Sequence, residues 1–67
     1  MTLVWFEGQH ISLEECAQRG IALEVRQYHA EGCWSQWHSI DHARAMRKAR
    51  VRVYGGWHLY EFRAVAQ

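Results

Sequence analysis

The first pattern along the chain is an alternation of apolar and polar side chains between residues 21 and 27, with Ile21, Leu23 and Val25 on the apolar side. A period of two is that of a strand with one buried face. The stretch Thr2–Phe6 is short and rich in large apolar and β-branched residues, and it predicts a further strand. We expect the three apolar residues of the alternating segment to face the core.

Two later segments predict hairpins. Glu31-Gly32 can turn the alternating strand into a return strand over Cys33–His38, although this second arm alternates poorly. Arg50–Tyr54 alternates again, Gly55-Gly56 is a two-residue turn signal, and Trp57–Arg63 returns. The last hairpin is the more clearly marked of the two.

The strongest helix signal begins at Ser12. Its hydroxyl can accept a hydrogen bond from the amide of Glu15, while the Glu15 carboxylate can reach back to the amide of Ser12, which makes a capping box. Gly20 can adopt the left-handed conformation that ends a helix. These residues predict a helix over Leu13–Arg19, with Cys16 on its packed side.

A second helix is predicted after Ser39, which we place at the N-cap, with Asp41 in the first turn, where a carboxylate favours the helix dipole. One face of this helix is apolar and consists of Ile40, Ala43, Met46 and Ala49. Another face is basic and consists of Arg44, Arg47 and Lys48, which stand at i, i+3 and i+4.

Together these elements predict an α+β fold with the order β-α-β-β-α-β-β, in which an antiparallel sheet of four or five strands packs with two short helices. Residues 1–67 make a single domain, because a chain of 67 residues has no room for a second. A chain of this length buries only about 60% of its surface on folding.

The aromatic content is high for such a chain, with four Trp, three Tyr and two Phe residues. Trp34 and Trp37 differ by three positions, so a regular strand would point them to opposite faces. The predicted last strand also carries aromatic residues on both faces. A single small sheet usually buries one face, so we expect a second copy of the chain, as in a homodimer, to cover the other.

The formal net charge is only +1, which excludes an acidic mimic of DNA, but the charges are unevenly placed. Residues 1–42 carry two arginines and six carboxylates, whereas residues 43–67 carry six cations and one carboxylate. Such asymmetry indicates either an interaction surface or pairing between the halves, for example with Glu14, Glu15 and Glu24. The sequence leaves both alternatives open.

Cysteine usage and hydropathy indicate a reduced, cytoplasmic chain. The two cysteines form no CxxC motif, and a secreted domain of this size usually carries four or more. The longest early apolar run, residues 3–6, is far shorter than a membrane span, and no signal peptide is visible.

The spacing H-x3-C-x4-H-x3-H raises the possibility of a zinc site, with His29, Cys33, His38 and His42 as ligands. The spacing fits none of the common zinc modules, which open with two close cysteines, so we predict no metal and no cofactor. No nucleophile with an orienting partner and no phosphate-binding glycine loop can be recognised either. We therefore predict that the protein is not an enzyme.

Trp, Tyr, Arg and Met are enriched at protein interfaces and are abundant here. We expect a non-enzymatic module that binds a protein partner through basic and aromatic side chains, namely Arg44, Arg47, Lys48, Arg50, Arg52, Tyr54, Trp57 and Tyr60. The alternative is a nucleic-acid-binding module that follows a phosphate backbone with the basic segment 44–52. No RNA- or DNA-binding signature accompanies that segment.

The run from the Ala/Arg helix through Val51-Arg52-Val53-Tyr54 to Trp57-His58-Leu59-Tyr60 resembles small inhibitors encoded by phages and mobile elements, including some anti-CRISPR proteins. The likeness covers residues 39–62 and is one of size and element order rather than of a motif. It implies a non-enzymatic protein that blocks a bacterial host complex by binding it. The near-neutral charge departs from the acidic members of that group.

Overall fold

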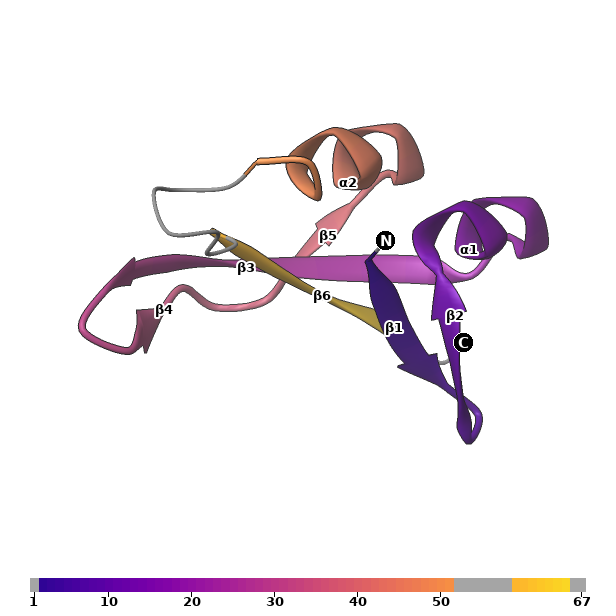
Figure 1. Cartoon of the computed structure of the whole chain (residues 1–67), viewed down its shortest axis with the longest axis horizontal. Helices are drawn as coiled ribbons and strands as arrows, with labels where there is room; N and C mark the ends of the chain where they lie inside the picture. The colour runs from indigo at the N-terminus through magenta and orange to yellow at the C-terminus, as the bar shows by residue number, and fades with distance from the viewer. Residues whose placement is uncertain (1, 52–58, 66–67) are drawn as a thin grey trace.

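The chain folds into two small antiparallel sheets and two short helices (Figure 1). The structure, a computed structural model, describes residues 2–51 and 59–65. The elements are β1 (Leu3–Phe6), β2 (Gln9–Ser12), α1 (Leu13–Arg19), β3 (Ala22–Ala30), β4 (Cys33–Trp34), β5 (His38–Ile40), α2 (His42–Lys48) and β6 (Tyr60–Val65). The predicted α+β class is confirmed. In this part of the chain the order is β-β-α-β-β-β-α-β, so two strands were not predicted as such.

The first of these is β2, which makes a hairpin with β1. Glu7 and Gly8 form the turn with φ angles of 49° and 84°, and Phe6 lies opposite Gln9. A Glu-Gly pair makes the same kind of turn at Glu31-Gly32, where φ is 50° and 81°. The sequence signal was therefore present at both turns, but β2 is only four residues long and merges directly into the helix.

The central strand of the larger sheet is β3, which pairs antiparallel with β4, β5 and β6. The return strand predicted over Cys33–His38 is in fact two strands, because the chain leaves the ladder between β4 and β5. Ser35, in this gap, remains hydrogen-bonded to β3. Its amide donates to the carbonyl of Gln27 over 2.8 Å, and its Oγ accepts from the Gln27 amide over 2.9 Å. The pairing resumes at His38, which lies opposite Val25.

The last predicted hairpin falls partly outside the described residues, because most of its first arm, its turn and the start of its second arm lie within 52–58. Its return strand is present as β6, which covers Tyr60–Val65. Arg50 was predicted in a strand, and this is wrong. Its amide donates to the carbonyl of Arg47 over 3.3 Å, so that it belongs to the turn that ends α2.

Of the two hydrogen bonds predicted for the capping box of α1, one is present. The Oγ of Ser12 accepts from the amide of Glu15 over 3.1 Å, and Gly20 ends the helix with a φ of 69°. The Glu15 carboxylate does not complete the capping box. It pairs instead with Arg19, one turn further along the same helix, over 3.1 Å.

The start of α2 differs from the prediction by two residues. Asp41, not Ser39, is the N-cap, and its Oδ1 accepts from the amide of Arg44 over 2.9 Å. Ser39 lies in β5, opposite Glu24. The packed face is centred on Ala45, which is fully buried, and Ala43 is exposed instead of belonging to it. Positions 42, 45, 46 and 49 follow the i, i+3, i+4, i+7 spacing of one helical face.

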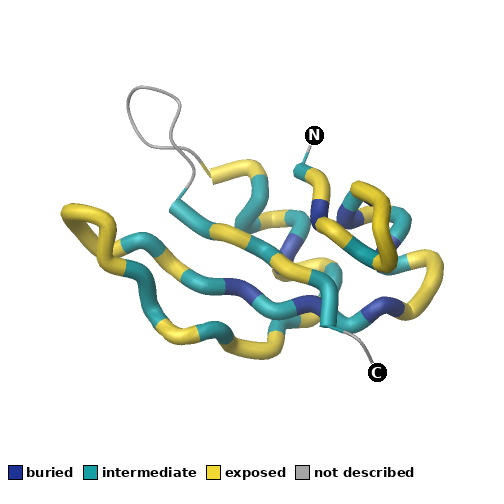
Figure 2. The backbone as a smooth tube through the Cα atoms, turned by 90° about the horizontal axis from the view of Figure 1, so that it is seen from below, coloured by how far each residue is buried: buried dark blue, intermediate teal, exposed yellow. Residues whose placement is uncertain are grey.

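Both helices lie on the same side of the larger sheet (Figure 1). One core joins the sheets and the helices, and Figure 2 shows its residues as the buried stretches of the tube. It consists of Val4, Ile11, Leu13, Cys16, Ile21, Leu23 and Ala45. The predicted inward residues of the first half, including Val25, are buried as expected.

The larger sheet therefore has an inner face toward α2, which carries Val25 and its cross-strand neighbour Phe62, and an outer face, which carries Glu24 and Arg63. Each helix has seven residues. Within the two described ranges, no helix is long and apolar enough to cross a membrane.

Candidate functional site

The outer face of the larger sheet carries two cross-strand ion pairs. Glu24 lies opposite Arg63, and Arg26 lies opposite Glu61. The Nε atoms of Arg63 and Arg26 donate to the facing carboxylates over 2.7 Å and 2.6 Å. Two acidic and two basic side chains of this face thus neutralise each other.

Two tryptophans stack on these arginines. The guanidinium carbon of Arg26 lies 4.6 Å from the ring centroid of Trp34 and 5.0 Å from that of Trp37. Arg63 lies 4.3 Å from the Trp37 centroid. The expectation that the two tryptophans point to opposite faces is wrong, because the strand is interrupted between them and both rings reach the outer face. The result is an alternating Trp–Arg ladder.

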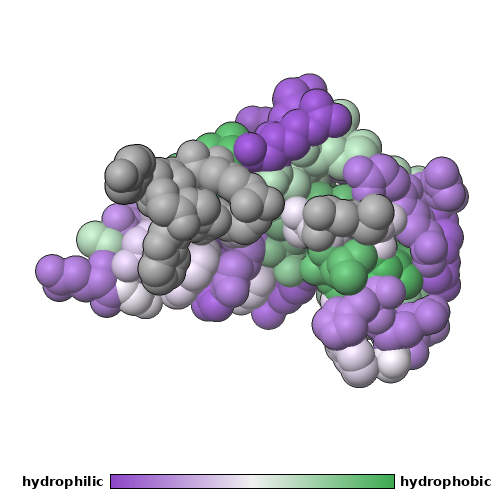
Figure 3. Space-filling view, in the orientation of Figure 1, coloured by the Kyte–Doolittle hydropathy of each residue, from purple (hydrophilic) through white to green (hydrophobic). Residues whose placement is uncertain are grey.

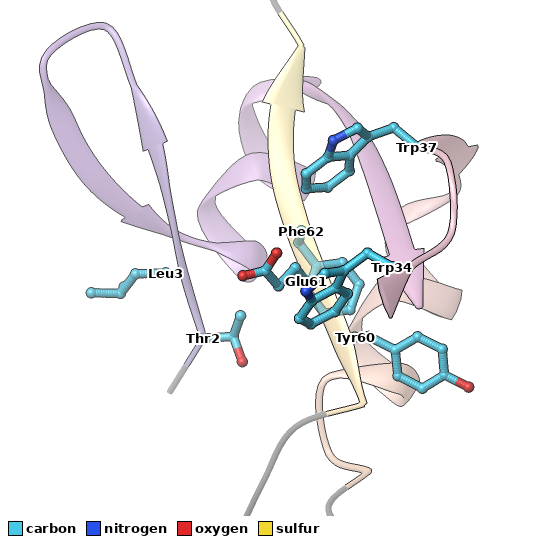
Figure 4. Close-up of a pocket in the computed structure, with 7 residues that line it drawn as sticks. All are labelled: Thr2, Leu3, Trp34, Trp37, Tyr60, Glu61 and Phe62. Atoms are coloured by element: carbon cyan, nitrogen blue, oxygen red, sulfur yellow. The ribbon is translucent and has the colours of Figure 1, made fainter. Parts of the chain in front are cut away.

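A groove of 680 Å³ adjoins this ladder (Figure 4). In Figure 4, Thr2 lies on the β1 side, the indole rings of Trp34 and Trp37 lie on the other, and the ring of Tyr60 is directed away from them. We call this the aromatic groove; it is lined by Thr2, Leu3, Trp34, Trp37, Tyr60, Glu61 and Phe62. Figure 3 shows an apolar area over β1, where Leu3 and Trp5 are 51% and 60% exposed.

The basic residues of α2 have a different environment. Arg44, Arg47 and Arg50 are exposed, and we call them the basic face. Hydrophilic residues stand out from α2 in Figure 3. Among residues 2–51 and 59–65, the ion pairs join Glu15 to Arg19, Glu61 to Arg26 and Glu24 to Arg63, and none includes a residue of the basic face. The alternative of pairing between the two halves is thus realised by Glu24 with Arg63, but among the described residues it does not extend to the basic face.

A second groove, of 430 Å³, lies between α2 and the inner face of the sheet. Its lining includes two cationic side chains of α2, Arg44 and Lys48, and two imidazoles, His29 and His38. The Nζ of Lys48 lies 4.5 Å from the centroid of the Tyr60 ring. We call this the basic groove; it is lined by Val25, Arg26, Gln27, His29, Ser35, His38, Ser39, Ile40, Arg44, Lys48 and Tyr60. No carboxylate belongs to this lining.

The structure thus brings part of the predicted binding set together. Arg44, Lys48 and Tyr60 meet at the basic groove, and Arg47 and Arg50 lie beside it on α2 and the turn after it. The predicted Arg52, Tyr54 and Trp57 lie outside the described residues. The predicted binding set did not include the residues added by the sheet, namely Arg26, His29, Trp34, Trp37, His38 and Arg63. The opposite charges at alternate positions of β3 and β6 were the signal that could have revealed the ladder.

The four candidate zinc ligands do not meet. His29 and His38 line the basic groove, whereas the Nε2 of His42 lies 2.7 Å from the carbonyl oxygen of Ile21. Cys33 is exposed in β4. The part of the chain with described coordinates holds no group of three or more His, Cys, Asp or Glu side chains that could bind a metal ion.

The chain matches no protein-family model, no curated protein and no solved structure. Its function is therefore inferred from the basic face and the two grooves.

Proposed function

We propose that this protein is a non-catalytic binding module whose basic face contacts an acidic surface of a protein partner. One observation carries this proposal. Three of the six described arginines pair with carboxylates of residues 2–51 and 59–65, and the other three, Arg44, Arg47 and Arg50, pair with none of these. Arg44 and Arg47 lie on α2, and Arg50 lies in the turn that follows it.

The electrostatic argument follows from this placement. Like charges at i, i+3 and i+4 destabilise an isolated helix by roughly 0.2–0.5 kcal/mol per pair. Arg47 and Lys48 offset part of this cost, because cations in the last turn favour the helix dipole. A partner that presents carboxylates to the basic face would relieve the remaining repulsion and would accelerate the encounter.

Aromatic side chains adjoin the charged ones. Tyr60 lines both the basic groove and the aromatic groove, so the charged and aromatic surfaces meet at the start of β6. Trp, Tyr and Arg are the residues most enriched at the energetic centres of protein interfaces. A charged region for steering next to rigid aromatic side chains supports a specific contact with a protein.

The resemblance of residues 39–62 to phage and mobile-element inhibitors gives the proposal its most specific form. The partner would be a bacterial complex, and binding would block it by occupying a surface that the complex needs. No chemical step by this protein is required for such an effect.

The experiment is a capture from bacterial lysate with and without nuclease, comparing the wild-type protein with Arg47→Glu. We expect the wild type to retain a partner after nuclease treatment, and Arg47→Glu to lose it by at least about tenfold, or roughly 1.4 kcal/mol. Arg19→Glu is the matched control, because it makes the same change of charge in the last turn of the other helix. It should retain the partner.

Three outcomes contradict the proposal. Capture that disappears with nuclease and weakens steeply with salt would favour the nucleic-acid alternative. Equal losses in both variants would show that overall charge, rather than the basic face, controls binding. Retention of the partner by Arg47→Glu would place the contact elsewhere.

A further inference from the structure

The basic groove differs from the basic face in being concave and rich in hydrogen-bond donors. Strand β3 places Gln27 and His29 on the inner face, and β5 places His38 opposite Val25 on the same face. Helix α2 contributes Arg44 and Lys48 to the lining of the groove. Ammonium and guanidinium groups only donate, and amide, imidazole and hydroxyl groups can also donate.

Two nearby charges do not belong to this donor set. The Arg26 guanidinium lies on the outer face, where it pairs with Glu61 and stacks between the two indoles. Asp41 caps α2 through the amide of Arg44 and does not line the groove. The groove therefore presents cationic and neutral donors without a carboxylate to balance them, which is an environment for an anion.

We infer that the basic groove binds a phosphate monoester. A monoester carries a charge of about −1.5 to −2 at neutral pH and offers three strong acceptor oxygens. Arg44 can supply a forked pair of donors and Lys48 a second full positive charge, while the imidazoles add further donors. A carboxylate or a phosphate diester brings only a single negative charge to the same groove.

The dimensions and the apolar lining fit the group that carries the phosphate. A volume of 430 Å³ exceeds what a free phosphate ion occupies and falls in the usual range for small-ligand sites. Val25, Ile40 and the Tyr60 ring supply apolar and aromatic contacts for the esterified part. The phosphate can come from a phosphorylated side chain or from a small phosphorylated metabolite, which share this chemistry.

The test is an NMR titration of the ¹⁵N-labelled protein at pH 7.5 with methyl phosphate, dimethyl phosphate and acetate. We expect saturable shifts with methyl phosphate, with a Kd of about 1 mM or below, and binding at least about tenfold weaker for the other two. The shifts should concentrate at His38, Arg44 and Lys48. A phosphoserine peptide and adenosine 5′-monophosphate, added separately, distinguish the two sources.

Variants on α2 provide the comparison. Arg44→Gln and Lys48→Gln should each weaken methyl phosphate binding by at least about tenfold. Arg47→Gln removes a cation from the same helix but not from the groove, and it should change the Kd by less than about twofold. The spectrum of each unliganded variant shows whether it folds, and His38→Asn is a further lining variant if one does not.

The inference is overturned if methyl phosphate gives no saturable shift, if acetate binds as tightly, or if Arg47→Gln weakens binding as much as Arg44→Gln. It goes beyond the proposed protein contact and can fail separately. Arg47→Glu alters the basic face without altering the groove lining, so the two proposals together predict lost partner capture with retained phosphate binding. Retained capture would contradict the protein contact alone, and lost phosphate binding would contradict the assignment to the groove alone.

Discussion

At the scale of single residues, the two cysteines show how burial decides side-chain chemistry. Cys16 is fully buried in the core, and desolvation by burial, together with the nearby Glu15 carboxylate, raises the pKa of its thiol. Cys33 lies exposed in β4, and neither cysteine forms a disulfide. The expected role of Cys16 as a small packing side chain of α1 agrees with this environment.

The raised pKa of Cys16 predicts a loss of stability at alkaline pH. The folded state favours the neutral thiol, so this contribution is complete below the unfolded-state pKa and decreases as the pH rises through the folded-state pKa. Between about pH 8 and 10 the free energy of unfolding of the wild type should fall more steeply than that of Cys16→Ala, by up to about 1.4 kcal/mol per pH unit.

Urea titrations across this pH range measure the effect, and Cys33→Ala is the matched control because it also removes one thiol. Its pH dependence should follow that of the wild type. Identical slopes for the wild type and Cys16→Ala would contradict the assignment of a perturbed thiol.

At the scale of elements, the extent of β5 explains why α2 starts where it does. Ser39 and Asp41 both belong to the residue types that favour N-caps, so local preference does not separate them. Pairing of Ser39 with Glu24 in the sheet commits it to an extended conformation, and the helix begins only after the ladder ends.

This assignment predicts unequal effects for two similar substitutions. Asp41→Ala should lower the free energy of unfolding by about 1 kcal/mol, because the amide of Arg44 loses its acceptor. Ser39→Ala should change it by less than about 0.5 kcal/mol, since the residue is exposed. Denaturant midpoints measure both, and a larger loss for Ser39→Ala would restore the cap predicted from the sequence.

The same comparison shows which elements could be predicted from the sequence. The alternation of apolar and polar residues in β3 and the N-cap of α1 are local signals, and they were sufficient to predict these two elements. The break between β4 and β5 was not predictable, because it depends on hydrogen bonds between Ser35 and Gln27, eight positions apart. The basic side of α2 followed from helical spacing. The basic groove depends on how α2 packs on β3, β5 and β6, and the aromatic groove depends on how β1 lies beside β6.

At the scale of the whole molecule, the two sheets share one core. Val4 and Ile11 from the first hairpin pack in the same cluster as Leu23 from the larger sheet, with Leu13 of α1 among them. A core residue that touches several elements couples their unfolding, so the hairpin should not open independently of the larger sheet.

Leu13→Ala tests this coupling. The side chain is 2% exposed, and its truncation should cost about 2–5 kcal/mol, a large part of the stability of such a small chain. Amide hydrogen exchange should show the slowest amides of β1–β2 and of β3 losing the same free energy. A loss confined to the hairpin would mean that it unfolds separately, and Gln18→Ala, at an exposed position of α1, is the neutral comparison.

The charge order on the outer face has a consequence for how the chain finds this fold. The smallest slip of β6 along β3 that keeps Phe62 inside is two residues. In one direction it would bring Glu61 opposite Glu24, and in the other it would bring Arg63 opposite Arg26. Like charges directly opposite each other are destabilising, so both misaligned pairings are rejected. The two ion pairs therefore favour the native register of β6 on β3, although the residues of each pair lie 35 and 39 positions apart in the chain.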